Sequence, residues 1–154
     1  MYLWMLFLLN SISLLIASME DIREKQIRLI WILLFMLGNC ASAFLLGNSV
    51  NVVLMVLAGG VFWGIVFLGI SFLTGEMIGK GDALMILAGG LSLGFFGSVM
   101  VIFYALCLSS LMGLFLLRVR NLKGYEIPFV PFYGSAYIVW WGIYLWERTV
   151  GYTG

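Results

Sequence analysis

Long apolar runs alternate with short polar segments along the whole chain, a pattern typical of a membrane protein with several spans. The runs cover approximately residues 2–19, 28–47, 50–74, 83–97, 99–117 and 129–146. A helix needs about 20 apolar residues to cross the hydrocarbon core, where backbone polar groups must pair within their own segment. Because the runs lack the alternation of strands, they predict an all-α protein.

The division between the fourth and fifth runs depends on length, because residues 83–117 contain no charged side chain. One helix over this stretch would be about 50 Å long, which is too long for a single crossing. The sequence GFFGS at 94–98 predicts a turn, so we expect six transmembrane helices in a single domain over residues 1–154. Small-residue pairs that suit close helix crossings stand four residues apart, namely Gly60 with Gly64 and Gly90 with Gly94.

The composition supports a bilayer environment and excludes several kinds of chemistry. The chain is 64% hydrophobic and 10% charged, whereas soluble domains are roughly a quarter charged. No basic stretch indicates nucleic acid. The absence of histidine excludes Ser-His and Cys-His catalysis, and Cys40 and Cys107 are isolated, so we expect no metal site and no cofactor.

The basic residues distribute unevenly between the two sides of the predicted membrane. Seven of the eight share one side, and these are Arg23, Lys25, Arg28, Lys80, Arg118, Arg120 and Lys123. The positive-inside rule makes that side cytoplasmic and places both termini outside the cytoplasm. Six acidic residues fall on the same side, namely Glu20, Asp21, Glu24, Glu76, Asp82 and Glu126.

Two of these acids, Asp21 and Asp82, are candidates for catalysis because one follows the first run and the other begins the fourth. Two facing carboxyl groups can share a proton, so that one activates water and the other polarises a carbonyl. Gly79 and Gly81 before Asp82 allow close approach of a backbone. On spacing alone, however, simpler explanations exist. Asp82 is then an acid at a helix start that the helix dipole favours, and EDIREKQIR at 20–28 is a charged loop.

Three segments together resemble the type IV prepilin peptidases. The sequence GEMIGKGD at 75–82 resembles their second aspartate motif, in which a glutamate precedes G-x-G-D. The sequence EDIREKQI at 20–27 resembles their first aspartate motif, and EIPFVPFYGSAYIVWWG at 126–142 is similar to their last span. The motifs follow in the family's order and cover most of the chain, which is therefore identified as a member.

The resemblance implies an intramembrane aspartyl protease of the GxGD type with its active site on the cytoplasmic side of the cell membrane. Its relatives remove a short basic leader from prepilins and pseudopilins, proteins of type IV pili and protein secretion. Carried over, Asp21 and Asp82 are the catalytic pair. The other residues carried over are Glu76, Gly79, Lys80 and Gly81, which support the second motif, and Pro128 and Pro131, which have a structural role at the entry to the last helix.

The sequence also departs from the family pattern at several points. Many members have proline and asparagine where this chain has Arg28 and Leu29, and a lysine where it has Leu84. The long cytoplasmic loop with paired CxxC motifs, linked to methylation of the trimmed pilin, is missing. We therefore expect a short form with protease activity only.

The expected substrate is a precursor with a basic leader and an apolar helix, and Glu20, Glu24 and Glu126 are candidates for attracting the leader. An archaeal preflagellin peptidase, or another GxGD intramembrane protease, is a close alternative. A small transporter or a secretion-assembly subunit is an alternative from another class, although a transporter favours acids near the bilayer midplane and these acids stand at span ends.

Overall fold

The computed structural model describes residues 2–47, 49–75, 78–120 and 127–150 and is all-helical over these ranges, which confirms the predicted class. The helices are α1 (Tyr2–Glu24), α2 (Leu29–Leu46), α3 (Val50–Leu73), α4 (Lys80–Arg120) and α5 (Val130–Val150). Within the described residues, four helices are long and apolar enough to cross a membrane: α1, α2, α3 and α4 as far as Arg118. The protein is therefore a membrane protein, whereas six crossings and the side of the termini remain predictions.

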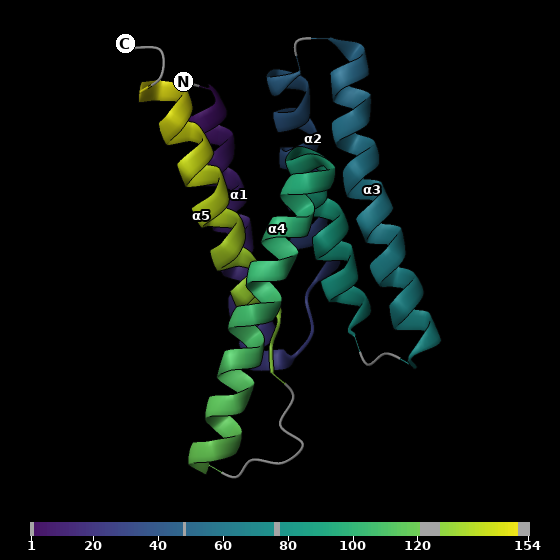
Figure 1. Ribbon diagram of the computed structural model, residues 1–154, viewed down its shortest axis with the longest axis vertical. Coiled ribbons are helices and arrows are strands. Elements are labelled where there is room, and N and C mark those ends of the chain that lie inside the picture. The colour runs from purple at the N-terminus through teal and green to yellow at the C-terminus, as the bar shows by residue number, and fades with distance from the viewer. Residues whose placement is uncertain (1, 48, 76–77, 121–126, 151–154) are drawn as a thin grey trace.

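Helix α4 is broken at Gly94, inside the segment in which the sequence predicts a turn. Gly94 has φ 68° and ψ −170°, a conformation that glycine adopts without steric cost. A Cβ built on Gly90 would lie only 3.0 Å from Ser98 Oγ, although residues eight apart in a continuous helix are separated by about 12 Å. The two halves of α4 therefore fold back on each other, as an inverted V in Figure 1.

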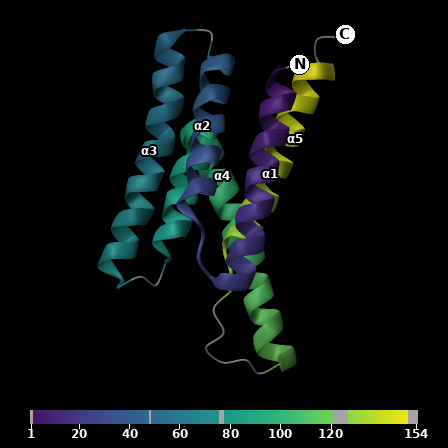
Figure 2. The same cartoon turned by 180° about the vertical axis from the view of Figure 1, so that it is seen from behind.

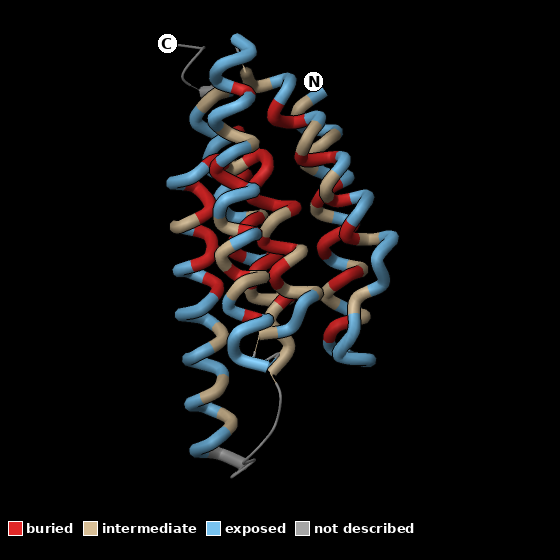
Figure 3. The backbone as a smooth tube through the Cα atoms, turned by 90° about the vertical axis from the view of Figure 1, so that its right-hand side faces the viewer, coloured by how far each residue is buried: buried red, intermediate tan, exposed pale blue. Residues whose placement is uncertain are grey.

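The helices form a bundle in which α4 packs against α2, α3 and α5, and α1 packs against α2 and α5 (Figures 1 and 2). Buried residues follow the middle of the bundle, whereas the end of α4 that extends beyond its neighbours is exposed (Figure 3). Helices α1 and α3 end where α2 and the first half of α4 begin. The α1–α2 and α3–α4 connections therefore lie at the same end of the bundle.

Helix α1 is longer than its apolar run, which ends at residue 19. The helix continues to Glu24 and includes all three acidic residues of the segment that the sequence assigned to a charged loop, Glu20, Asp21 and Glu24. Lys25 then adopts a left-handed conformation with φ 52°, and its N–H donates to Asp21 O at 3.1 Å. The prediction of a charged loop over residues 20–28 is wrong for residues 20–24, because apolar length sets what can cross the bilayer, whereas backbone hydrogen bonds set where the helix ends.

Backbone contact between α3 and α4 depends on glycine. A Cβ on Gly60 would lie 2.3 Å from Gly90 C, and one on Gly64 would lie 2.4 Å from Leu87 Cβ. No side chain fits at these crossings, which confirms the predicted packing role of these glycines. Because α4 begins with the GKGD segment, this packing also sets the position of Asp82.

A buried polar cluster joins α2, α4 and α5 in the middle of the bundle. Asn39 Oδ1 accepts hydrogen bonds from Ser92 Oγ and Tyr137 OH, and Trp141 Nε1 donates to Ser92 Oγ at 3.3 Å. The amide of Asn39 donates to Phe35 O at 2.7 Å. In an apolar environment each such group must be paired, so the cluster fixes the relative positions of these three helices.

We predict that Gly60→Ala lowers the free energy of unfolding by about 1–3 kcal/mol, because the added methyl overpacks the crossing with α4. The measurement is thermal unfolding of the purified protein in detergent. Gly69→Ala is the matched control, since it changes the same helix at a position with nothing within 4 Å of the added Cβ, and it should leave stability unchanged or raise it. Equal losses for the two variants would contradict the crossing.

Candidate active site

The carboxylate of Asp21 is buried at the end of α1 and is bound to the start of α5. Asp21 is 7% exposed, and its Oδ2 accepts a hydrogen bond from Val130 N at 3.0 Å. Val130 is the first residue of α5, so its N–H is one of the donors that a helix leaves without an internal acceptor. The positive end of the helix dipole also favours a carboxylate here.

The two prolines explain why Val130 supplies this donor. Pro131 stands in the first turn of α5, where its missing N–H is tolerated. The next N–H, from Phe132, donates to Phe129 O at 3.1 Å. Pro128 precedes this turn and cannot donate either. Among residues 128–132, Val130 is thus the donor that reaches Asp21.

Asp82 is held in a similar way at the start of α4. It is the third residue of the helix, is half-buried and accepts a backbone hydrogen bond from Gly79. The carbonyl of Gly79 in turn accepts from Ala83 N at 3.2 Å. The bond to the carbonyl of Gly79 is the first backbone hydrogen bond of the helix, and the bond from Gly79 N–H to the Asp82 side chain corresponds to one half of a capping box. A Cβ on Gly79 would lie 3.2 Å from Asp82 Oδ2, so a side chain at this position would crowd the carboxylate.

The structure brings Asp21 and Asp82 within electrostatic reach of each other. They come from different helices and are each oriented by the backbone at a helix start. Two carboxyl groups in such a partly buried site can act as a unit that shares a proton. This arrangement is suited to general acid and base catalysis on a water molecule.

The two aspartate segments also touch directly. A Cβ on Gly81 would lie 3.4 Å from Ile27 Cδ1 and 4.0 Å from Ile27 Cβ, so the α1–α2 loop packs against the start of α4. Ser71 Oγ holds the other side of this start by donating to Ile78 O at 2.6 Å. The ammonium group of Lys80 lies 5.4 Å from the ring centroid of Phe72 on α3, at a distance that allows a cation–π interaction.

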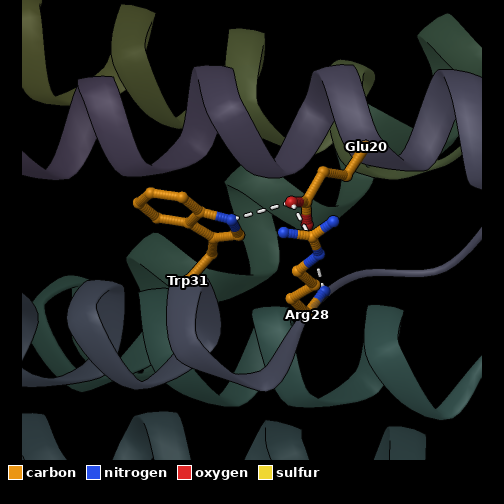
Figure 4. A network of polar contacts seen from close by, with 3 residues as sticks. All are labelled: Glu20, Arg28 and Trp31. Atoms are coloured by element: carbon orange, nitrogen blue, oxygen red, sulfur yellow. Dashed lines mark hydrogen bonds and ion pairs between the residues drawn. The ribbon is translucent and has the colours of Figure 1, made fainter.

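Glu20 is engaged in a network that the sequence did not indicate (Figure 4). Its Oε1 accepts from Trp31 Nε1 at 3.0 Å, and its Oε2 accepts from Arg28 N at 3.1 Å. Arg28 Nε lies 3.5 Å from Oε1, and the Glu20 side chain is 15% exposed. By contrast, Glu24 is exposed at the end of α1. Two further acids that the sequence singled out, Glu76 and Glu126, lie outside the described residues.

The sequence did not indicate the groups that bind the acids. Val130 contributes a backbone N–H, which no side-chain motif encodes, although the two nearby prolines mark a helix start with few donors. Trp31 reads as one more apolar residue of its run. No group of three Asp, Glu or Cys side chains in the described part of the chain is placed to hold a metal ion.

Comparison with known proteins gives one result. The model of a family described as the type IV leader peptidase family matches residues 8–117. The matched region contains Asp21, Asp82 and the glycines before Asp82, and it ends before the Pro-Phe-Val-Pro-Phe segment. No curated protein and no solved structure matched the chain.

We predict that cysteines at positions 27 and 81 form a disulfide, because a Cβ–Cβ distance of 4.0 Å lies within the range for this bond. Cys40 and Cys107 are first replaced by alanine. After oxidation with copper phenanthroline in isolated membranes, both thiols should be protected from maleimide–polyethylene glycol, and the gel shift should be lost. Cysteines at 27 and 79 are the control, since no Ile27 atom lies within 4 Å of a Cβ on Gly79. Equal oxidation of both pairs would contradict the contact.

Proposed function

The chain belongs to the type IV leader peptidase family, and we propose that it is an aspartyl endopeptidase that removes the short basic leader of prepilin-like or pseudopilin-like precursors. Membership implies a protease, and therefore a protein substrate. The observation that supports the proposal is that Asp21 lies close enough to Asp82 to influence it electrostatically, while each accepts a backbone hydrogen bond at a helix start. Such a pair needs no histidine, and the chain has none.

In the proposed reaction the two aspartates hold one proton between them. The ionised carboxylate takes a proton from a water molecule as its oxygen attacks the scissile carbonyl, and the protonated partner donates a hydrogen bond to the carbonyl oxygen. Collapse of the tetrahedral intermediate then breaks the C–N bond, and the leaving amine takes a proton from the pair. The hydrogen bonds from Val130 and Gly79 support this reaction because they fix both carboxyl groups before the substrate binds.

The proposed substrate follows from the position of the pair. The acids stand at helix ends rather than in the middle of the bundle, at the end that also carries Arg23, Arg28 and Lys80. The positive-inside rule supports a cytoplasmic site at the cell membrane. A precursor whose charged leader lies in the cytoplasm and whose apolar helix lies in the bilayer would present the bond between them at this level.

We predict that Asp21→Asn and Asp82→Asn each reduce leader cleavage by roughly 10²-fold or more, because each removes a group that transfers protons. The assay is the gel shift of a co-expressed prepilin at matched membrane levels, and a preflagellin is tested in parallel to separate the two substrate classes. Glu147→Gln, an acid-to-amide change at an exposed position in α5, should retain full cleavage. Cleavage that survives either aspartate substitution would exclude the proposed chemistry.

We also predict that Glu24→Lys raises KM for a basic leader about two- to five-fold with kcat unchanged, because exposed charges interact weakly. The effect should decrease as salt is added. The measurement is steady-state cleavage by the purified enzyme in detergent, with Glu147→Lys as the matched charge reversal in α5. A loss of kcat, or an equal effect of the control, would argue against leader binding at Glu24.

A further inference from the structure

The carboxylate of Glu20 precedes Asp21 in the last turn of α1 and is held on both of its oxygens. Both of its oxygens accept hydrogen bonds, one from the indole of Trp31 and one from the backbone N–H of Arg28 (Figure 4). An acid that attracts a leader by its charge would be expected to project into water. Glu20 is instead directed towards α2, with 15% of its side chain exposed.

The turn that Glu20 spans is not favoured by its own sequence. Lys25 adopts φ 52°, a left-handed conformation in which a residue with a long side chain is uncommon. Hydrogen bonds to groups outside the turn offset part of the cost of this conformation. The contact from Glu20 to Arg28 N joins the two sides of this turn, and the contact to Trp31 joins α1 to α2.

This turn touches the segments of both aspartates. Asp21 shares the last turn of α1 with Glu20, and Lys25 N–H donates to Asp21 O at 3.1 Å. Ile27, in the same loop, lies against Gly81, the residue before Asp82. A displacement of the loop would therefore move one aspartate relative to the other.

We propose that Glu20, held by Trp31 and Arg28, is a positioning residue that keeps Asp21 and Asp82 in register and does not bind the leader. The inference rests on the proposed function for its kinetic test. The ion pair with Arg28 contributes little, because the arginine side chain is 69% exposed. The two N–H donors, on Trp31 and on the backbone of Arg28, carry the effect.

The kinetic test compares Glu20→Ala, Trp31→Phe and the double variant with wild type. Each single variant should lower kcat about ten-fold with KM within two-fold, because small misplacements of catalytic groups are costly. The double variant should be no worse than Glu20→Ala, because Glu20→Ala already removes the hydrogen bond from Trp31. Glu147→Ala and Trp146→Phe, at exposed positions in α5, are the matched controls and should retain wild-type values.

Two further variants separate positioning from leader binding. Glu20→Gln keeps one of the two accepting oxygens and loses the charge, so it should recover part of the kcat lost in Glu20→Ala. Arg28→Ala keeps its backbone N–H and should stay within two-fold of wild type. A rise in KM with unchanged kcat, equal for Glu20→Ala and Glu20→Gln, would overturn the proposal in favour of leader binding.

A readout independent of cleavage is the oxidation rate of the cysteine pair at 27 and 81. This rate should fall several-fold when Glu20→Ala or Trp31→Phe is added, and an unchanged rate would overturn the proposal even if the enzyme proved inactive on every leader tested. If wild type and Asp21→Asn are equally inactive while the oxidation rate responds to Trp31→Phe, the proposed function fails and the positioning role stands. Where Glu20→Ala does not accumulate in membranes, Trp31→Phe and Glu20→Gln provide the same comparison.

Discussion

The hydrogen bond from Val130 N–H to Asp21 is the interaction on which the rest of the site depends. An apolar bundle can hold neither a carboxylate nor a free backbone donor without a large cost in free energy. The first turn of α5 has such a donor, and the end of α1 has such an acceptor. By pairing them, the protein places an acid in a largely apolar environment and joins two helices that lie far apart in the sequence.

The second aspartate follows the same principle, since Asp82 accepts a hydrogen bond from the backbone of Gly79 at the start of α4. Its position then depends on how α4 is packed. Glycine contacts hold the first half of α4 against α3, and the polar cluster around Asn39 and Ser92 ties it to α2 and α5. The geometry of the acid pair is thus a consequence of packing along the whole bundle.

Three acids within five residues at the end of α1 have three different environments. Asp21 is buried against α5, Glu20 is bound by Trp31 and Arg28, and Glu24 is exposed. Glu20 and Glu24 are one helical turn apart and share a face, yet only Glu20 lies close enough to α2 to be bound by it. The three acids contribute equally to the net charge, but their different surroundings suit them to different roles.

The sequence by itself determined the all-helical class, the approximate limits of the helices, the break near Gly94 and the family. These follow from apolar run length, local glycine and short motifs, all of which are properties of neighbouring residues. The tertiary structure decided what the sequence pattern does not contain: the end of α1 beyond its apolar run, the electrostatic proximity of Asp21 and Asp82, and the partners of Glu20. The physical reason is that these features depend on backbone donors and on contacts between distant segments, which leave no periodic pattern in the chain.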